Sequence, residues 1–150
     1  MNPSEFSNIE RSLGIELPQS YKSLLASYPI GVSEDIKSHG LFADPNRVIQ
    51  ENIALRTEGW FRIDWPVSYF VIGDDGCGDY YFMVIGKDEK VYFADHECGS
   101  HPVDAVEECL SSDSLSKHFS RELELERDYV EYERAKRERH QNRKWWEIWK

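Results

Sequence analysis

The chain has 150 residues, of which 40% are hydrophobic and 13% aromatic, which is enough apolar material for one folded domain and too much for a disordered chain. Its formal net charge is −10. Because an acidic surface repels phosphate, this charge argues against direct nucleic-acid binding, and it suits either a basic protein partner or solubility alone.

The sequence also indicates a compartment. It contains no run of eighteen apolar residues, which argues against stable membrane insertion. The first residues lack the basic start and apolar stretch of a secretory signal. The three cysteines are an odd number without CxxC spacing, as suits free thiols in a reducing compartment. We therefore expect a cytoplasmic protein.

The N-terminal segment predicts two helices. Ser4 is a suitable cap for the first helix, and Gly14 is expected to end it. The apolar residues of this helix recur at helical spacing: Phe6, Ile9 and Leu13. The second helix follows Pro18, which is favoured in a first helical turn. Its apolar residues recur in the same way: Tyr21, Leu24, Leu25 and Tyr28.

The next segment predicts a loop and a third helix. Residues 32–40 are expected to form a loop, with a short strand at residues 41–42. Asp44 followed by Pro45 is typical of a helix start. This third helix is expected to end near Gly59.

Three segments rich in valine, isoleucine, tyrosine and phenylalanine follow, over residues 67–72, 79–85 and 90–94. Short turns containing glycine, aspartate or lysine separate them, so they predict an antiparallel meander. Pro102 is then expected to begin a further helix that runs through Leu110.

Ser114 is expected to cap a long final helix. The first half of this helix carries two adjacent apolar stripes, which would pack on the sheet or on a second subunit. They consist of Leu115, Phe119, Leu123 and Val130, and of Leu125, Tyr129 and Tyr132. The second half is charged, with oppositely charged residues four apart. We expect an α+β domain over residues 1–113, with a central antiparallel sheet flanked by N-terminal helices, and residues 114–150 as its helical extension.

The stretch VIGDDGCGDYYFMVIG, residues 71–86, places three aspartates between two expected strands. A calcium loop alternates its aspartates and carries glutamate at the twelfth position, where this chain has Ile85. No phosphate-binding GxxxxGK(S/T) motif is present. A metal nuclease would pair Asp75 with an Asp-x-Lys such as Asp88 and Lys90, but these two fall in the next turn. The favoured interpretation is a turn whose glycines adopt positive φ.

Two further clusters are weaker candidates for chemistry. His96, Cys98 and His101 lack the paired spacing of zinc ligands. Asp95, His96 and Glu97 offer an acid–base group, but no serine or cysteine stands at a nucleophile position to use it. We therefore expect no metal, no cofactor and no catalytic residue, and an enzyme is the least favoured class.

Asp74, Asp75 and Asp79 are expected to form an exposed negative loop, close to Asp95 and Glu97 if the meander forms. A nuclease holds phosphate in a basic cleft, which carboxylates can fill as phosphate mimics. These five residues are therefore the expected contacts with a partner. On this interpretation, reversing the charges of Asp74 and Asp75 weakens partner binding and leaves the fold intact.

The order of motifs resembles the SUKH superfamily of the Smi/Knr type. LPxxYxxLL starts at Leu17, IGxxGxGD at Ile72 and VxxxDHE at Val91, with Trp60 before the sheet, and the resemblance covers roughly residues 9–110. It implies an α+β sheet in which IGxxGxGD is a strand–turn–strand feature. The residues expected to set the fold are Leu17, Pro18, Tyr21, Trp60, Gly73, Gly76, Gly78, Asp79 and His96.

The resemblance also implies a binding role. Many bacterial members resemble immunity proteins, which bind and block toxin domains, often nucleases, that competing cells deliver. Eukaryotic relatives are linked to cell-wall regulation and signalling. Neither role needs a catalytic site or a metal, so we expect a non-catalytic protein whose partner is a basic toxin domain.

The C-terminal end lies outside this resemblance and is rich in residues typical of interfaces: Trp145, Trp146, Ile148 and Trp149. This tail can fold back onto the domain or a second copy, anchor a partner, or lie weakly at a membrane surface. We favour a protein contact, including a homodimer through the C-terminal helix. The alternative function is therefore an adaptor or regulatory scaffold that interacts through the helix and the tail.

Overall fold

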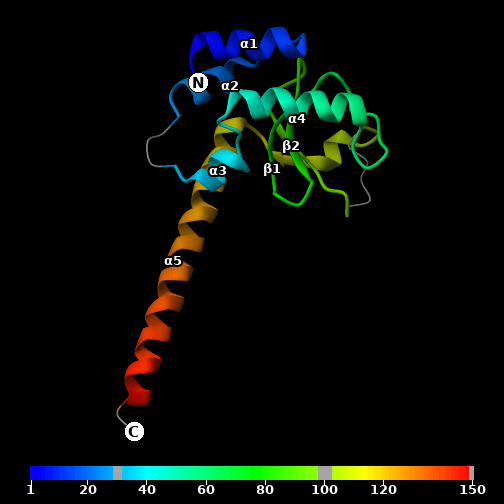
Figure 1. The fold of residues 1–150 in the computed structure, drawn as a ribbon. Coiled ribbons are helices and arrows are strands. Elements are labelled where there is room, and N and C mark those ends of the chain that lie inside the picture. Colours follow the sequence, from blue (N-terminus) through cyan, green and yellow to red (C-terminus); the bar gives the residue numbers. More distant parts are fainter. Residues whose placement is uncertain (29–31, 98–102, 149–150) are drawn as a thin grey trace.

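The computed structural model describes residues 1–28, 32–97 and 103–148, apart from the side chains of residue 35 and residues 141–148. In these ranges a group of helices precedes an antiparallel sheet, and one long helix follows it (Figure 1). The α+β class and the meander expected from the sequence are confirmed. None of the described helices combines the length and the apolar character needed to cross a membrane.

The helices before the sheet are α1 (Pro3–Leu13), α2 (Gln19–Ala26), α3 (Glu34–Ser38) and α4 (Pro45–Glu58). The expected cap of α1 at Ser4 is wrong, because Asn2 occupies that role. Its side chain accepts hydrogen bonds from the backbone N–H groups of Ser4 and Glu5, and the Glu5 carboxylate in turn accepts one from the backbone N–H of Asn2. This reciprocal capping box satisfies the free donors of the first turn. Gly14 ends α1 in a left-handed conformation, as expected.

The sheet has the order β1-β2-β3-β4, and all neighbours are antiparallel. Its strands are β1 (Tyr69–Asp74), β2 (Tyr80–Val84), β3 (Val91–Ala94) and β4 (Leu110–Ser112). The helix expected through Leu110 is wrong: a 3₁₀ turn, η1 (Val106–Cys109), leads into β4. Leu110 pairs with Tyr92 because β3 offers an open edge, which outweighs a helical pattern of only three apolar residues. Pro102 lies outside the described residues.

The region before α4 also differs from expectation. Residues 32–40 contain α3 rather than only loop, since Ser33 caps it by accepting a hydrogen bond from the N–H of the buried Ile36. The expected strand at residues 41–42 is wrong. Phe42 donates one backbone hydrogen bond to Ile72 of β1, at 2.8 Å, but the segment does not join the sheet.

The core lies between the helices and the sheet. β1 is buried along its whole length. Tyr21 of α2 packs edge-on against Phe70 of β1, with ring centroids 5.0 Å apart. Trp65 packs in the same manner against Phe82 of β2, at 5.3 Å. Leu17 of the LPxxYxxLL motif is also buried, so this motif contributes to the fold through the core.

The final helix, α5 (Leu115–Ile148), runs away from the body, and its C-terminal end lies far from the other elements (Figure 1). Ser114 accepts a hydrogen bond from the N–H of Lys117, as expected for the cap. Of the expected apolar stripes, only the part nearest the body packs on the core: Leu115 and Phe119 are buried, Leu123 is partly buried, and Phe119 lies against Tyr28. The side chains of residues 145, 146 and 148, and the whole of residue 149, lie outside the described part.

Candidate functional site

The glycine-rich loop, residues 75–79, joins β1 to β2, and the glycine before it allows a close approach of two backbones. A Cβ on Gly73 would lie 2.5 Å from the carbonyl oxygens of both His39 and Gly40. Real Cβ atoms do not come so close to backbone oxygen, so this position requires glycine. Asp74 then donates its backbone N–H to the His39 carbonyl at 2.9 Å. The close approach ties β1 to the segment after α3.

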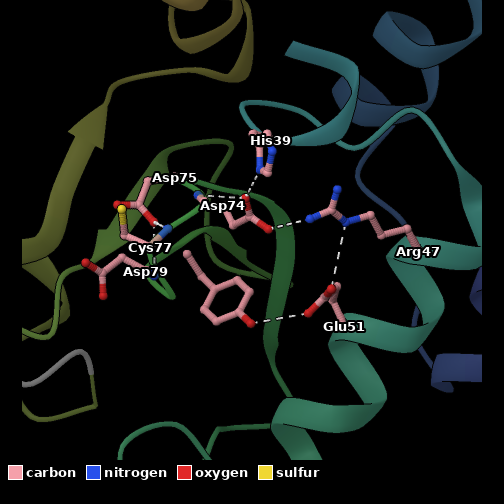
Figure 2. A network of polar contacts seen from close by, with 9 residues as sticks. His39, Arg47, Glu51, Asp74, Asp75, Cys77 and Asp79 are labelled. Carbon is pink, nitrogen blue, oxygen red and sulfur yellow. Dashed lines mark hydrogen bonds and ion pairs between the residues drawn. The ribbon is translucent and has the colours of Figure 1, made fainter. Parts of the chain in front are cut away.

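Asp74 is a buried member of a polar network and not an exposed carboxylate. Its side chain accepts hydrogen bonds from His39 Nδ1 at 2.5 Å and from Arg47 at 2.7 Å (Figure 2). Arg47 also forms an ion pair with Glu51, at 3.8 Å, and the hydroxyl of Tyr80 donates a hydrogen bond to Glu51 at 3.2 Å. Burial, together with Glu51, raises the pKa of Tyr80 to about 12, so its hydroxyl stays protonated and donates.

Asp75 shapes the loop and remains at the surface. Its Oδ1 accepts hydrogen bonds from the backbone N–H groups of Cys77, at 2.8 Å, and Asp79, at 3.1 Å. This is the usual way in which aspartate satisfies turn amides. Gly76 and Gly78 complete the turn with φ values of 78° and 100°, which residues other than glycine rarely adopt. The interpretation of this stretch as a turn is therefore confirmed.

Asp79 is 5% exposed and holds the segment after β3. One of its oxygens accepts hydrogen bonds from the backbone N–H of His96, at 3.0 Å, and from His96 Nδ1, at 2.7 Å. This bond raises the pKa of His96 above its usual value. Tyr80 pairs with Ala94 in the sheet. The meander therefore brings the glycine-rich loop close to the segment after β3, as expected.

The same place holds a cluster of potential metal ligands. Asp79, Asp95 and His96 each offer one ligand atom, and these atoms lie within 4.8 Å of one another. Asp79 already binds both the ring and the backbone of His96, so an ion would displace a hydrogen bond that orders this segment. No further feature of the described cluster points to an ion, and we assign none. Cys98 and His101 lie outside the described residues.

A strained turn places an aromatic ring beside the loop. Trp60 and Ile63 exchange backbone hydrogen bonds of 2.8 and 2.9 Å, and between them Phe61 and Arg62 adopt φ values of 47° and 70°. The Phe61 ring is 57% exposed and stacks on the His96 ring, with centroids 4.7 Å apart. Trp60 is buried and donates its indole N–H to the Gly78 carbonyl at 2.9 Å.

The expected acidic surface is therefore smaller than the sequence suggested. Asp74 and Asp79 are 8% and 5% exposed and hydrogen-bonded inside the protein, so the expectation that both are exposed is wrong. Asp75 and Glu97 are exposed, and Asp95 is half-buried. We use "the Phe61 surface" for a set of neighbouring residues on the loop, on the segment after β3 and on the strained turn. It comprises Phe61, Asp75, Asp95, His96 and Glu97.

Sequence reasoning missed Phe61 and the network around Asp74. Arg47 and Glu51 are spaced i, i+4 on α4, a spacing that predicts an ion pair. Nothing local to them indicates Asp74, which is distant in sequence. Phe61 also carries no signal, because neither its residue type nor its neighbours favour a left-handed conformation.

The described residues thus form a small α+β domain with an exposed aromatic ring and exposed carboxylates at the end of its sheet. The chain belongs to the SMI1/KNR4 family (SUKH-1), whose model matches residues 1–112. The resemblance noted in the sequence is confirmed. Members of this family are typically immunity proteins and generally non-catalytic. No curated protein and no solved structure gives a significant match.

Proposed function

We propose that this protein binds and neutralises a toxin domain delivered by a competing bacterium, and that it does so without catalysis. The observation that carries the proposal is membership of the SUKH family over residues 1–112, because immunity is the typical role of that family. The match covers the whole sheet and all three segments of the Phe61 surface.

Charge favours a nuclease as the toxin. Residues 1–116 contain 8 basic and 20 acidic residues, a balance of −12. A nuclease must hold phosphate and therefore has a basic cleft, which an acidic partner approaches quickly and complements. Asp75 and Glu97 are exposed carboxylates of the glycine-rich loop and of the segment after β3, which Asp79 joins by its hydrogen bonds to His96. Asp74 and Asp79 support this surface from inside through their hydrogen bonds.

The Phe61 surface has the composition of a protein interface. Energetic centres of interfaces are enriched in aromatic side chains and surrounded by polar groups. Phe61 supplies an exposed ring whose orientation the His96 stack fixes. Its left-handed backbone costs free energy, and such strain persists where a functional geometry needs it. We therefore assign Phe61 as the anchor and the carboxylates as its rim.

The test is survival of bacteria that express the toxin domain encoded beside the gene for this chain. Co-expression of the wild-type protein is expected to restore growth and to give a co-purifying complex. Failure to restore growth, with the toxin shown to be lethal and this protein shown to be folded, would reject the pairing. The adaptor or scaffold function would then be favoured.

Surface variants locate the contact. Asp75→Asn with Glu97→Gln keeps the turn acceptor and removes two charges, and we expect association to slow by about 3- to 10-fold at low salt. Phe61→Ala is expected to weaken binding by about tenfold or more. The matched control is Glu16→Gln with Glu89→Gln, two exposed carboxylates outside the Phe61 surface. Equal effects of the two charge pairs would place the interface elsewhere.

A further inference from the structure

Helix α5 presents an apolar face that the described part of the body does not cover. Leu125, Tyr129, Val130 and Tyr132 are exposed by 56%, 65%, 59% and 62%. They lie on the part of the helix that projects from the body (Figure 1). Leu125, Tyr129 and Tyr132 are separated by four and then three residues, which is the spacing of a coiled-coil seam. This spacing is suited to contact with another helix.

The charges of α5 separate along its length. Residues 121–133 contain 2 basic and 6 acidic residues, a balance of −4. Residues 134–144 contain 6 basic residues and 1 acidic residue, a balance of +5. The projecting helix thus has an acidic half next to the body and a basic half beyond it.

Effects within one helix do not account for this separation. The helix dipole favours acidic residues in the first turn and basic residues in the last. The first turn of α5 has no acidic residue and the last has no basic one. Local ion pairs are present, between Lys136 and Glu133 at 3.0 Å and between Arg134 and Glu138 at 3.9 Å. Such pairs need alternating charges and not two separate blocks.

We propose that two copies of this chain pair through α5 in an antiparallel, two-fold symmetric arrangement centred near residue 134. The acidic half of each helix then faces the basic half of the other. A parallel pair would place acid against acid and base against base, which is unfavourable. The two-fold axis makes the contact self-complementary and closed, as in most homodimers. This pairing does not depend on toxin binding.

The arrangement also gives the apolar seam a partner of suitable chemistry. With the centre at residue 134, Tyr129 lies level with Arg139 of the second copy, and Tyr132 with Lys136. Cations over tyrosine rings are stabilising, and Lys136 already lies 5.8 Å from the Tyr132 ring of its own chain. Residues 145–148 of one copy come level with residues 120–123 of the other.

The test is the mass of the full chain in solution, measured by sedimentation over about 5 to 300 μM at low salt. We expect a concentration-dependent dimer that dissociates as salt screens the facing charges. Lys136→Glu with Arg139→Glu should raise the apparent dissociation constant by about tenfold or more. The matched control is Arg127→Glu with Arg134→Glu, which has the same charge change on the opposite side of the helix. Circular dichroism checks that both variants keep the helix.

Spin labels test the direction of pairing. In a chain with Cys77→Ser and Cys98→Ser, a label at Glu124→Cys lies level with residue 144 of the second copy. The two labels should then be about 30 Å apart along the axis, against about 10 Å in a parallel pair. The proposal would be overturned by a chain that is monomeric at every concentration, or by a label distance of about 10 Å, as in a parallel pair. It would also be overturned if the control variant weakened the dimer as much as Lys136→Glu with Arg139→Glu. Binding of a monomeric wild-type chain to anionic vesicles would also overturn it, in favour of a membrane contact.

Discussion

Arg47 donates a 2.7 Å hydrogen bond to the carboxylate of Asp74 and so joins α4 to the last residue of β1. Asp74 also accepts hydrogen bonds from His39 and from the backbone N–H of Gly76. One buried carboxylate therefore orders a helix, the segment after α3 and the glycine-rich loop together. The loop that carries Asp75 owes its position to the Arg47–Asp74 pair.

Replacing Arg47 is expected to destabilise the fold. Arg47→Met should lower the free energy of unfolding by about 1–3 kcal/mol, because it leaves the buried Asp74 carboxylate without its cation while Arg47 itself is partly exposed. Urea denaturation measures this. The control Arg62→Met alters an exposed side chain and should change stability by less than about 0.5 kcal/mol. Equal losses in the two variants would contradict the role assigned to the pair.

The same pair revises a prediction made from the sequence. Reversal of Asp74 together with Asp75 was expected to leave the fold intact, which would require both carboxylates to be exposed. Asp74→Lys instead places a cation beside Arg47 and His39 in a buried site, so we expect loss of folding. Asp75→Asn keeps its acceptor atom and should remain folded by circular dichroism. An Asp74→Lys variant with wild-type stability would disprove this.

Gly73 and Gly14 are required for different reasons: Gly73 is crowded by neighbouring backbone atoms, whereas Gly14 has a positive φ. Gly73→Ala puts a methyl group 2.5 Å from two backbone oxygens, and we expect a loss of more than about 2 kcal/mol in thermal unfolding. Gly14 has open space around it and a φ of 65°, so Gly14→Ala should cost only about 1 kcal/mol. If Gly73→Ala were the milder change, the close approach to residues 39 and 40 would not be a constraint.

Local patterns predicted the elements well where one signal dominates. Asp44 before Pro45 marked the start of α4, and alternating valine, tyrosine and phenylalanine marked the strands of the meander. They failed where a short segment depends on a distant one. β4 exists because the edge of β3 is open, and nothing in residues 110–112 specifies that.

The sequence predicted where the candidate site lies, but not which of its aspartates are exposed. The motif IGxxGxGD correctly located the loop, and VxxxDHE located the segment that the meander brings beside it. Whether an aspartate is exposed depends on cations elsewhere in the chain. Arg47 and Asp74, like His96 and Asp79, are distant in sequence and are brought together by the folded chain. Sequence spacing carries no information about such long-range pairs.

Asn52 is a buried polar residue that binds α4 to β1. Its side chain accepts a hydrogen bond from the Val71 N–H and donates to the carbonyls of Val71 and Val48, all at 2.8–2.9 Å. Asn52→Ala should lower the free energy of unfolding by about 2–4 kcal/mol in urea, because it strips both backbone groups of Val71 of a partner. The control Asn46→Ala makes the same change at an exposed position of α4. A loss no larger than that of the control would contradict this account.

His118 is fully buried at the base of α5 and is expected to control stability in acid. Its Nε2 donates to the Gly40 carbonyl at 2.9 Å, and Arg121 and Glu122 lie near its Nδ1. Burial, helped by the Arg121 cation, lowers the pKa of His118 to about 4. The unfolded chain therefore binds this proton near pH 6.5, before the folded protein does.

The sign of the pH dependence follows from that difference. Above about pH 6.5 the histidine is neutral in both states and has no effect, whereas between about pH 6.5 and 4 the unfolded state binds more protons, so stability falls as pH falls. The total loss is about 3 kcal/mol. His118→Gln keeps the donor to Gly40 without titrating. Urea unfolding of both proteins from pH 7.5 to 4.5 should show the variant gaining relative to wild type as pH falls. Parallel curves would mean that His118 titrates normally in the folded protein.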